Sequence, residues 1–181
     1  MVNITIKVFV FARQKGFFSQ YVGLDRKQFL SLRLKNKMID FITLCDYVGT
    51  FAFAISGIRL ASAKKFDWFG AYVVGVVTAV GGGTIRDVLL NATSFWMLQL
   101  SYLVISGLAL LFVLVFRKYV VRLNNTFFIF DAIGLGLFAV VGIAKTLDFG
   151  FPMWVAVVMG TITGAFGGMM RDILINEEPL I

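Results

Sequence analysis

Charged side chains are sparse in the apolar body of this sequence, and four of them form two adjacent pairs. Arg86-Asp87 and Arg171-Asp172 each lie near the end of a long apolar stretch that contains a run of glycines. Charges inside a membrane-spanning segment are costly and usually mark ion pathways or buried ion pairs. The chain has no histidine and one cysteine, Cys45, so no nucleophile and base pair can be assembled. We therefore predict that these pairs form part of an ion pathway or a buried ion pair, and we expect no enzymatic activity.

The two pairs belong to two copies of one motif. Val80–Asp87 reads VGGGTIRD, and 85 residues later Ala165–Asp172 reads AFGGMMRD. Composition bias is the alternative explanation, but the agreement includes Asp, Arg and Asn residues, which are rare here. Further positions agree without a gap: Asp46 with Asp131, Gly49 with Gly134, Phe53 with Phe138, Gly57 with Gly142, Gly75 with Gly160, Thr78 with Thr163, and Asn91 with Asn176. We predict an internal duplication, with a first repeat over residues 38–122 and a second over 123–181.

The composition is that of an integral membrane protein. Hydrophobic residues make up 59% of the chain and charged residues 15%, whereas soluble domains carry about 25% charge. A spanning helix needs roughly 20 apolar residues, and the apolar runs lack the alternation of a membrane barrel. Five runs qualify as spans: Ile39–Ala61, Phe69–Leu90, Met97–Phe116, Phe127–Leu147 and Met153–Ile175. Aromatic residues near the span ends, Tyr102 among them, suit the headgroup layer. We expect an all-α protein in a lipid bilayer.

The number of spans in the first repeat decides how the second is oriented. Three spans are an odd number, so the second repeat begins on the opposite side of the membrane. The fold class that follows is a pair of inverted repeats of three transmembrane helices, with glycine-kinked second and fifth helices, as in many transport proteins. The second repeat has only two spans up to Ile181. We therefore expect a sixth helix beyond that residue and interpret the chain as C-terminally incomplete.

Basic residues indicate how the spans are oriented. Two loops are rich in Lys and Arg: the first holds Arg59, Lys64 and Lys65, and the third holds Arg117, Lys118 and Arg122. The positive-inside rule places both in the cytoplasm, so the mature N-terminus is expected to be extracytoplasmic. Residues 1–37 contradict this placement, with eight Lys and Arg against one Asp. We interpret them as a basic N-terminal extension upstream of a native start at Met38; a real exported or amphipathic tail is the alternative.

The remaining chain has nine basic and nine acidic residues, so we expect no nucleic acid partner. It also lacks a metal-ligand cluster and a phosphate-binding loop, so we expect no metal and no cofactor.

Glycine runs inside a helix permit a kink and free backbone groups. At membrane depth, freed groups are tolerated only when they are buried in protein or line a wet cavity. We predict two kinks around an aqueous path, formed by Gly81, Gly82, Gly83, Gly167 and Gly168. Close helix packing is the alternative. A polar lining is predicted from Thr78, Thr84, Thr161 and Thr163; bonding of each hydroxyl to its own helix is the alternative.

Each repeat also has an early aspartate on the same predicted side of the membrane as its late arginine. We expect Asp46 to pair with Arg86, and Asp131 with Arg171, on opposite sides of the pathway. Anchoring of these charges at the membrane interface is the alternative. Lys145 ends the fourth span, where it either extends to the interface or responds to membrane voltage.

The two motifs, together with Asp46–Gly57 (DYVGTFAFAISG), resemble the prokaryotic TRIC family, the trimeric intracellular cation channels, whose domain is also labelled a glycine transporter. The resemblance implies seven helices, in two inverted three-helix repeats and a final helix, in the bacterial inner (plasma) membrane. It also implies a homotrimer with one pore per subunit, lined by the two kinked helices and selective for monovalent cations such as potassium. A secondary transporter of a small amino acid such as glycine is the alternative, and a purely structural or assembly role is the third.

Overall fold

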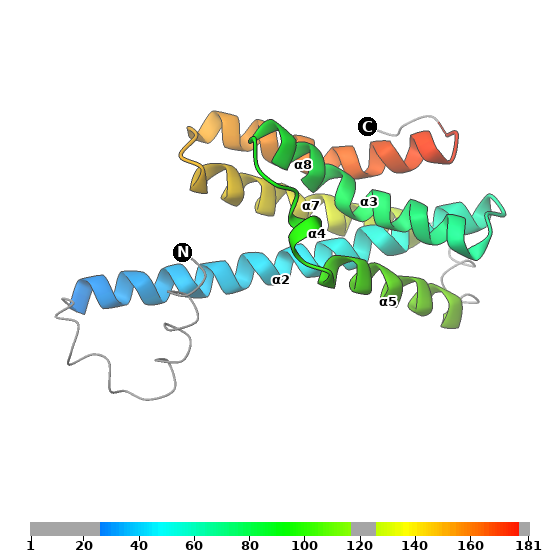
Figure 1. The fold of residues 1–181 in the computed structure, drawn as a ribbon, viewed down its shortest axis with the longest axis horizontal. Coiled ribbons are helices and arrows are strands. Elements are labelled where there is room, and N and C mark those ends of the chain that lie inside the picture. Colours follow the sequence, from blue (N-terminus) through cyan, green and yellow to red (C-terminus); the bar gives the residue numbers. More distant parts are fainter. Residues whose placement is uncertain (1–25, 117–125, 178–181) are drawn as a thin grey trace. The chain divides into compact units, whose positions relative to one another are not determined.

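The computed structural model describes residues 26–116 and 126–177, and every element there is a helix. The helices are α2 (Arg26–Ala63), α3 (Trp68–Leu89), α4 (Phe95–Leu98), α5 (Ser101–Val115), α7 (Thr126–Asp148) and α8 (Met153–Leu174). Figure 1 shows their order along the chain. The prediction of an all-α fold is therefore confirmed.

The chain divides into two compact units, Met1–Asp40 and Phe41–Ile181. In the first unit the description begins at Arg26, where α2 starts. Residues 1–25 of the predicted N-terminal extension lie outside the described residues, and for residues 26–36 only the backbone is described. The third-loop cations Arg117, Lys118 and Arg122 also lie outside the described residues. The helix contacts and the candidate site described below belong to the second unit.

Four helices are long and apolar enough to cross a membrane: Lys37–Ala63 within α2, Trp68–Leu89, Phe128–Asp148 within α7, and Met153–Leu174. The prediction of one continuous third span is wrong. The α4 helix ends at Leu98, Gln99 is extended, and α5 has 15 residues, or about 22 Å at 1.5 Å per residue. The first residue of α4 is fixed to α3, because the Phe95 N–H donates to Asp87 Oδ2 at 3.0 Å.

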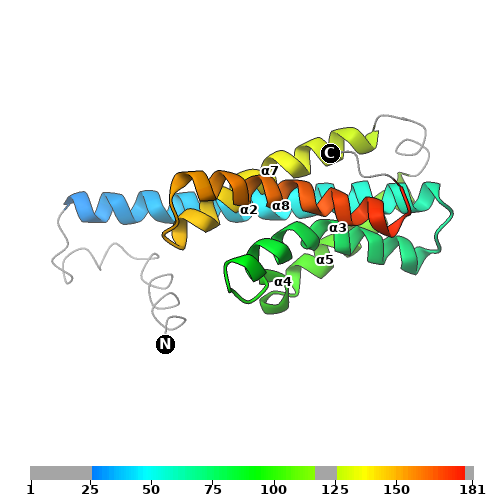
Figure 2. The same cartoon turned by 90° about the horizontal axis from the view of Figure 1, so that it is seen from above.

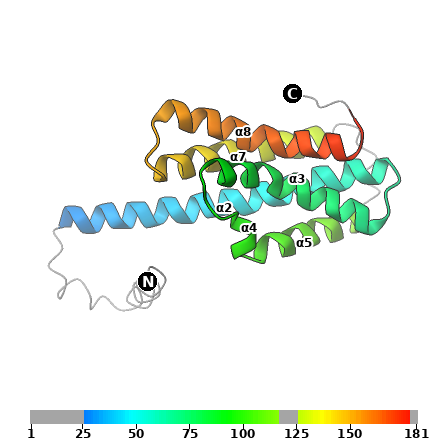
Figure 3. The same cartoon turned by 45° about the horizontal axis from the view of Figure 1, so that its top comes forward.

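The α3 helix lies between α5 and α8 in all three ribbon views (Figures 1, 2 and 3). Against α8 the backbones approach closely at two glycines. A Cβ built on Gly82 would overlap the carbonyl oxygen of Thr163, and one on Gly167 would lie 2.5 Å from the carbonyl oxygen of Thr78. These pairings run antiparallel, so α3 and α8 cross where the two copies of the motif begin.

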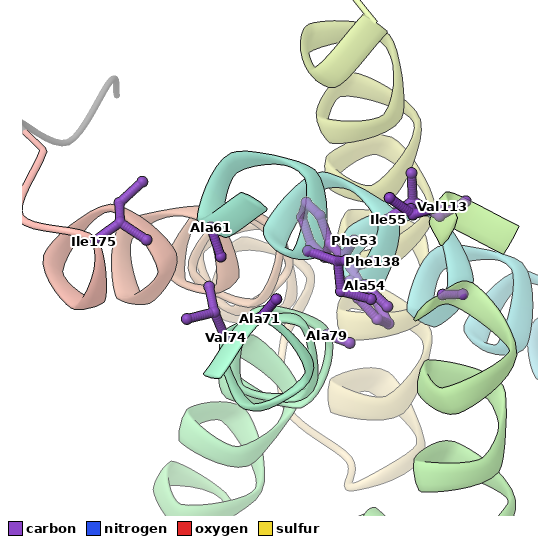
Figure 4. Close-up of a cluster of buried hydrophobic side chains, with 12 residues drawn as sticks. Phe53, Ala54, Ile55, Ala61, Ala71, Val74, Ala79, Val113, Phe138 and Ile175 are labelled. Carbon is purple, nitrogen blue, oxygen red and sulfur yellow. The ribbon is translucent and has the colours of Figure 1, made fainter. Parts of the chain in front are cut away.

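Other contacts recur at the same offset. The rings of Phe53 and Phe138 are equivalent positions and lie 5.1 Å apart between α2 and α7 (Figure 4). Gly49 packs on Phe138, and Gly134 packs on Phe53. In each repeat, a phenylalanine ring therefore packs against a glycine of the other repeat.

The turns repeat as well. Asn91 and Asn176, the second residues after α3 and α8, have φ values of 53° and 55°. Lys65 and Gly150, also equivalent, have φ values of 63° and 83°. Left-handed backbone is uncommon outside glycine, so its recurrence at matched positions extends the duplication from the sequence to the backbone.

Small residues make up much of the core that holds these helices together, which lets the helix axes approach closely. The main buried cluster, most of it drawn in Figure 4, consists of Phe53, Ala54, Ile55, Ile58, Ala61, Ala71, Val74, Ala79, Ala109, Val113, Phe138 and Ile175.

Candidate functional site: two charge clusters

The Arg-Asp pairs form two buried charge clusters. We define the second charge cluster first, because it is the simpler: it comprises Asp131, Arg171, Asp172 and Ser56. Arg171 Nη1 donates to Asp131 Oδ1 at 2.5 Å and to Ser56 Oγ at 2.8 Å. Its Nε donates to Asp172 Oδ1 at 2.7 Å. The arginine is only 2% exposed, and the expected contact of Asp131 with Arg171 is present.

Ser56 completes this cluster from the other repeat. Its hydroxyl donates to Asp131 Oδ1 at 3.3 Å while it accepts from Arg171. The serine is fully buried. One hydroxyl of α2 therefore bridges the carboxylate of α7 and the guanidinium of α8.

The first charge cluster comprises Asp46, Arg86, Asp87, Lys145 and Asp148. Asp87, fully buried, accepts from Arg86 Nε and Nη2 at 2.8 Å each and from Lys145 Nζ at 2.9 Å, all at Oδ1. Lys145 belongs to α7, so this ion pair joins the second repeat to α3. Its side chain is 29% exposed.

The expected pairing of Asp46 with Arg86 is not found among the described residues, and that prediction is wrong for this structure. Asp46 Oδ2 instead accepts a hydrogen bond of 2.5 Å from the hydroxyl of Tyr102 on α5. Arg86 is only 2% exposed, and its other nitrogens are directed to Asp87. Within the described part of the chain, Arg86 Nη1 is the one buried side-chain nitrogen or oxygen without a hydrogen-bond partner.

A cavity of about 190 Å³ adjoins the first charge cluster. A buried water needs about 10–15 Å³ of such space, so the cavity has room for several. Its lining is Ile42, Thr43, Asp46, Arg86, Phe95, Tyr102, Val141, Lys145 and Asp148. The cavity brings the predicted charges Asp46, Arg86 and Lys145 together with residues of α5 and α7.

The five predicted glycines have different surroundings. Gly82 and Gly167 lie where α3 and α8 cross, and Gly83 lies under the ring of Phe95. Gly81 and Gly168 have room for a methyl group, with nearest atoms at 3.6 and 3.8 Å. Both α3 and α8 are continuous α-helices through their glycines. Close packing is thus observed at the crossing, while a kink stays a prediction.

The four predicted threonines each donate to the carbonyl four residues earlier: Thr78 to Val74, Thr84 to Val80, Thr161 to Val157, and Thr163 to Met159. Thr78 and Thr163 are fully buried. The hydroxyl protons are therefore used within the helices, as the alternative interpretation expected, and none of the four lines the cavity.

Sequence reasoning missed four residues of the site: Ser56, Phe95, Tyr102 and Asp148. Ser56 was detectable as an isolated hydroxyl in an apolar run. Tyr102 was assigned to the headgroup layer from its place near a span end. Phe95 carried no signal, because its role depends on Gly83 leaving space for its ring.

Four long apolar helices and buried ion pairs define the class: a multi-pass helical membrane protein. The family model described as "Glycine transporter" matches residues 43–118 and 128–181, and the chain belongs to this family.

Curated relatives agree with the assignment. The inner membrane protein YadS of UPF0126 from Escherichia coli K12 is 42% identical over 138 residues, covering 75% of this chain and 67% of YadS. A UPF0126 membrane protein of Vibrio cholerae is 40% identical over 140 residues, covering 76% of this chain and 59% of that protein. The chain thus spans about two thirds of the length of these relatives, or less.

Two solved structures are similar in fold. One is the TRIC trimeric intracellular cation channel orthologue from Rhodobacter sphaeroides, with a TM-score of 0.74, 37% identity, and coverage of 78% of this chain and 73% of that one. The other is a prokaryotic TRIC channel crystallised in 0.5 M KCl, with a TM-score of 0.74, 32% identity, and coverage of 78% and 74%. Both identities are high enough to support the resemblance read from the glycine motifs.

Proposed function

We propose that this protein is a channel for monovalent cations of the potassium type. The pathway runs between α3 and α8 in each subunit, and the subunits assemble as a homotrimer in the inner membrane with an extracytoplasmic N-terminus. The similar solved structures are described as trimeric cation channels, and a similar relative is described as an inner membrane protein; both support the proposal.

The charge balance of the two clusters is the observation that carries it. In the first charge cluster, Asp46, Asp87 and Asp148 exceed Arg86 and Lys145 by one negative charge. In the second, two aspartates exceed Arg171 by one. Excess negative charge in a low-dielectric cleft raises the local concentration of cations and lowers that of anions.

The two clusters lie on either side of the close contact between α3 and α8. Arg86 and Arg171 each lie six residues beyond the crossing centre at Val80 and Ala165, about 9 Å along each helix. Because α3 and α8 are antiparallel, the clusters flank the crossing on opposite sides. A cation would therefore meet a weakly negative site on either side of Gly82 and Gly167.

Lys145 is the charge through which voltage could act in this scheme. It is held by one ion pair to Asp87 and is the most exposed cation of the first charge cluster. Displacing one charge across the full membrane field is worth about 2.3 kcal/mol per 100 mV, which is enough to compete with such a pair.

Planar bilayer recording of the purified protein tests the proposal. Under a potassium chloride gradient we expect a reversal potential close to the potassium equilibrium potential. Asp148→Asn should reduce the K⁺ to Cl⁻ permeability ratio, because Asp148 is exposed and lines the cavity. Glu177→Gln is the matched control, since the Glu177 side chain is half-exposed, pairs with Lys64 and does not line the cavity. Folded protein without current would refute the channel, as an assembly role predicts.

Transport of a small amino acid is the second candidate, and one observation favours it. The cavity is lined by carboxylates and by cationic groups, which matches the two charges of a zwitterion. Saturable glycine counterflow into vesicles, with no accompanying current, would support the carrier over the channel.

A further inference from the structure

The two arginines of the repeats differ in one atom's surroundings. Arg171 Nη1 contacts Asp131 and Ser56, whereas Arg86 Nη1 is buried without a partner. The duplication assigns the equivalent positions: Asp46 corresponds to Asp131, and Val141 corresponds to Ser56. Both Asp46 and Val141 line the same small cavity as Arg86.

Neither equivalent residue accepts a hydrogen bond from Arg86 Nη1, and the reason differs between the two. Val141 has no hydroxyl to accept a hydrogen bond. Asp46 has the right carboxylate, but the Tyr102 hydroxyl holds one of its oxygens at 2.5 Å. Tyr102 itself is kept in place by the ring of Phe95, with ring centroids 4.4 Å apart in an edge arrangement.

We propose that Tyr102 is a positioning residue which holds Asp46 away from Arg86, so that Asp46 has two alternative partners. In the first arrangement, described here, Asp46 joins α2 to α5 through Tyr102. In the second, Asp46 accepts from Arg86 Nη1 and joins α2 to α3, as Asp131 joins α7 to α8 through Arg171. Arg86 Nη1 has no protein acceptor in the first arrangement, so a released Asp46 carboxylate can accept from it, and a hydrogen bond to a charged group is stronger than a neutral one.

In the second arrangement, Arg86 contacts Asp46 in the first charge cluster as Arg171 contacts Asp131 in the second charge cluster. An arginine-aspartate contact across the cavity neutralises Asp46 and reduces its attraction for a passing cation. Tyr102 therefore favours the conducting arrangement. The predicted effect on current rests on the proposed channel function. The predicted change in the partner of Asp46 does not depend on ion flux.

Tyr102→Phe is the decisive variant, because it removes the hydroxyl and retains the ring that packs on Phe95. In a crystal structure of this variant we expect Asp46 within hydrogen-bond distance of Arg86 Nη1. We also expect the time-averaged potassium current to fall by roughly three- to tenfold, the equivalent of one hydrogen bond.

Tyr47→Phe is the matched control. Its hydroxyl contacts Gln99 and Ser101 and no charged group, and its ring, which packs on Tyr102, is retained, so it should leave both readouts unchanged. Val141→Ser supplies the hydroxyl that Ser56 gives Arg171, and should shift Asp46 in the same direction as Tyr102→Phe; Val141→Ala should not.

A double-mutant cycle separates this inference from the channel proposal. Thermal unfolding of Asp46→Asn, Arg86→Lys and the double variant should reveal coupling in the Tyr102→Phe background and little in the parent. Absence of current in the parent would refute the channel but leave this result standing. An Asp46 that stays apart from Arg86 in Tyr102→Phe, or equal effects of Tyr47→Phe and Tyr102→Phe, would overturn the inference.

Discussion

The second charge cluster is a closed set of contacts, whereas the first has an unsatisfied donor and an adjoining cavity. Both contain the same Arg-Asp pair, at the end of helices that share a glycine motif. In the second, Arg171 reaches a carboxylate on α7 and a hydroxyl on α2. In the first, the one hydrogen-bond partner found for Arg86 among the described residues is Asp87, and Asp87 is shared with Lys145.

The difference comes from neighbouring positions and not from the motif itself. Ser56 corresponds to Val141, and Lys145 corresponds to Leu60. One substitution removes a hydroxyl from the first charge cluster, and the other adds a cation to it. A duplicated pair of charges can thus become rigid in one copy and adjustable in the other through two changes outside the pair.

The largest expected effect comes from removing each arginine in turn. Arg171→Met removes the buried guanidinium that Asp131 and Asp172 share, so we expect a loss of about 3–5 kcal/mol in the free energy of unfolding. Arg86→Met leaves Asp87 with Lys145 and the Phe95 N–H, so we expect a loss of about 1–3 kcal/mol. Chemical unfolding in detergent measures both, and equal losses would contradict the contrast between the clusters.

A second prediction concerns the crossing between the clusters. Gly82→Ala places a methyl group onto the Thr163 carbonyl, and a backbone atom cannot rotate away. We expect the helices to separate, at a cost of about 1–3 kcal/mol. Gly81→Ala is the matched control and should be neutral or stabilising, since alanine favours helix by about 1 kcal/mol over glycine. Gly167→Ala and Gly168→Ala repeat the test in α8, and a tolerated Gly82→Ala would refute this account of the crossing.

Removing the added cation should affect selectivity more than stability. Lys145→Gln changes the net charge of the first charge cluster from one negative to two, because Lys145 is one of its two cations. We expect the K⁺ to Cl⁻ permeability ratio to rise by roughly two- to tenfold through the stronger local potential. Lys64→Gln, which removes a half-exposed lysine paired with Glu177, is the control. An unchanged ratio in Lys145→Gln would place the first charge cluster outside the pathway.

The sequence predicted the features that depend on spacing. The offset between Asp46 and Asp131 and the doubled Arg-Asp motif indicated a duplication, and the contact of Asp131 with Arg171 followed from the same pattern. The predicted contact of Asp46 with Arg86 is not formed, because the partner of Asp46 depends on which donor lies within hydrogen-bond distance of it. That donor, Tyr102, lies beyond an irregular segment at Gln99. No periodicity in the sequence predicts how such a segment aims the helix after it.

The smallest expected effect is at the threonines, and it tests how firmly that irregular segment is attached. Thr84 accepts a hydrogen bond of 3.1 Å from the indole Nε1 of Trp96, while its equivalent in the second repeat is Met169. Thr84→Val keeps the side-chain shape but leaves the part-buried indole without its acceptor, which costs about 0.5–1.5 kcal/mol. Thr161→Val is the control, since Thr161 is exposed and bonds only its own helix. Trp96 fluorescence should report the lost contact in the first variant and not in the second. If neither variant changes the emission, Asp87 alone fixes α4 to α3, and the first charge cluster depends even more strongly on its ion pairs.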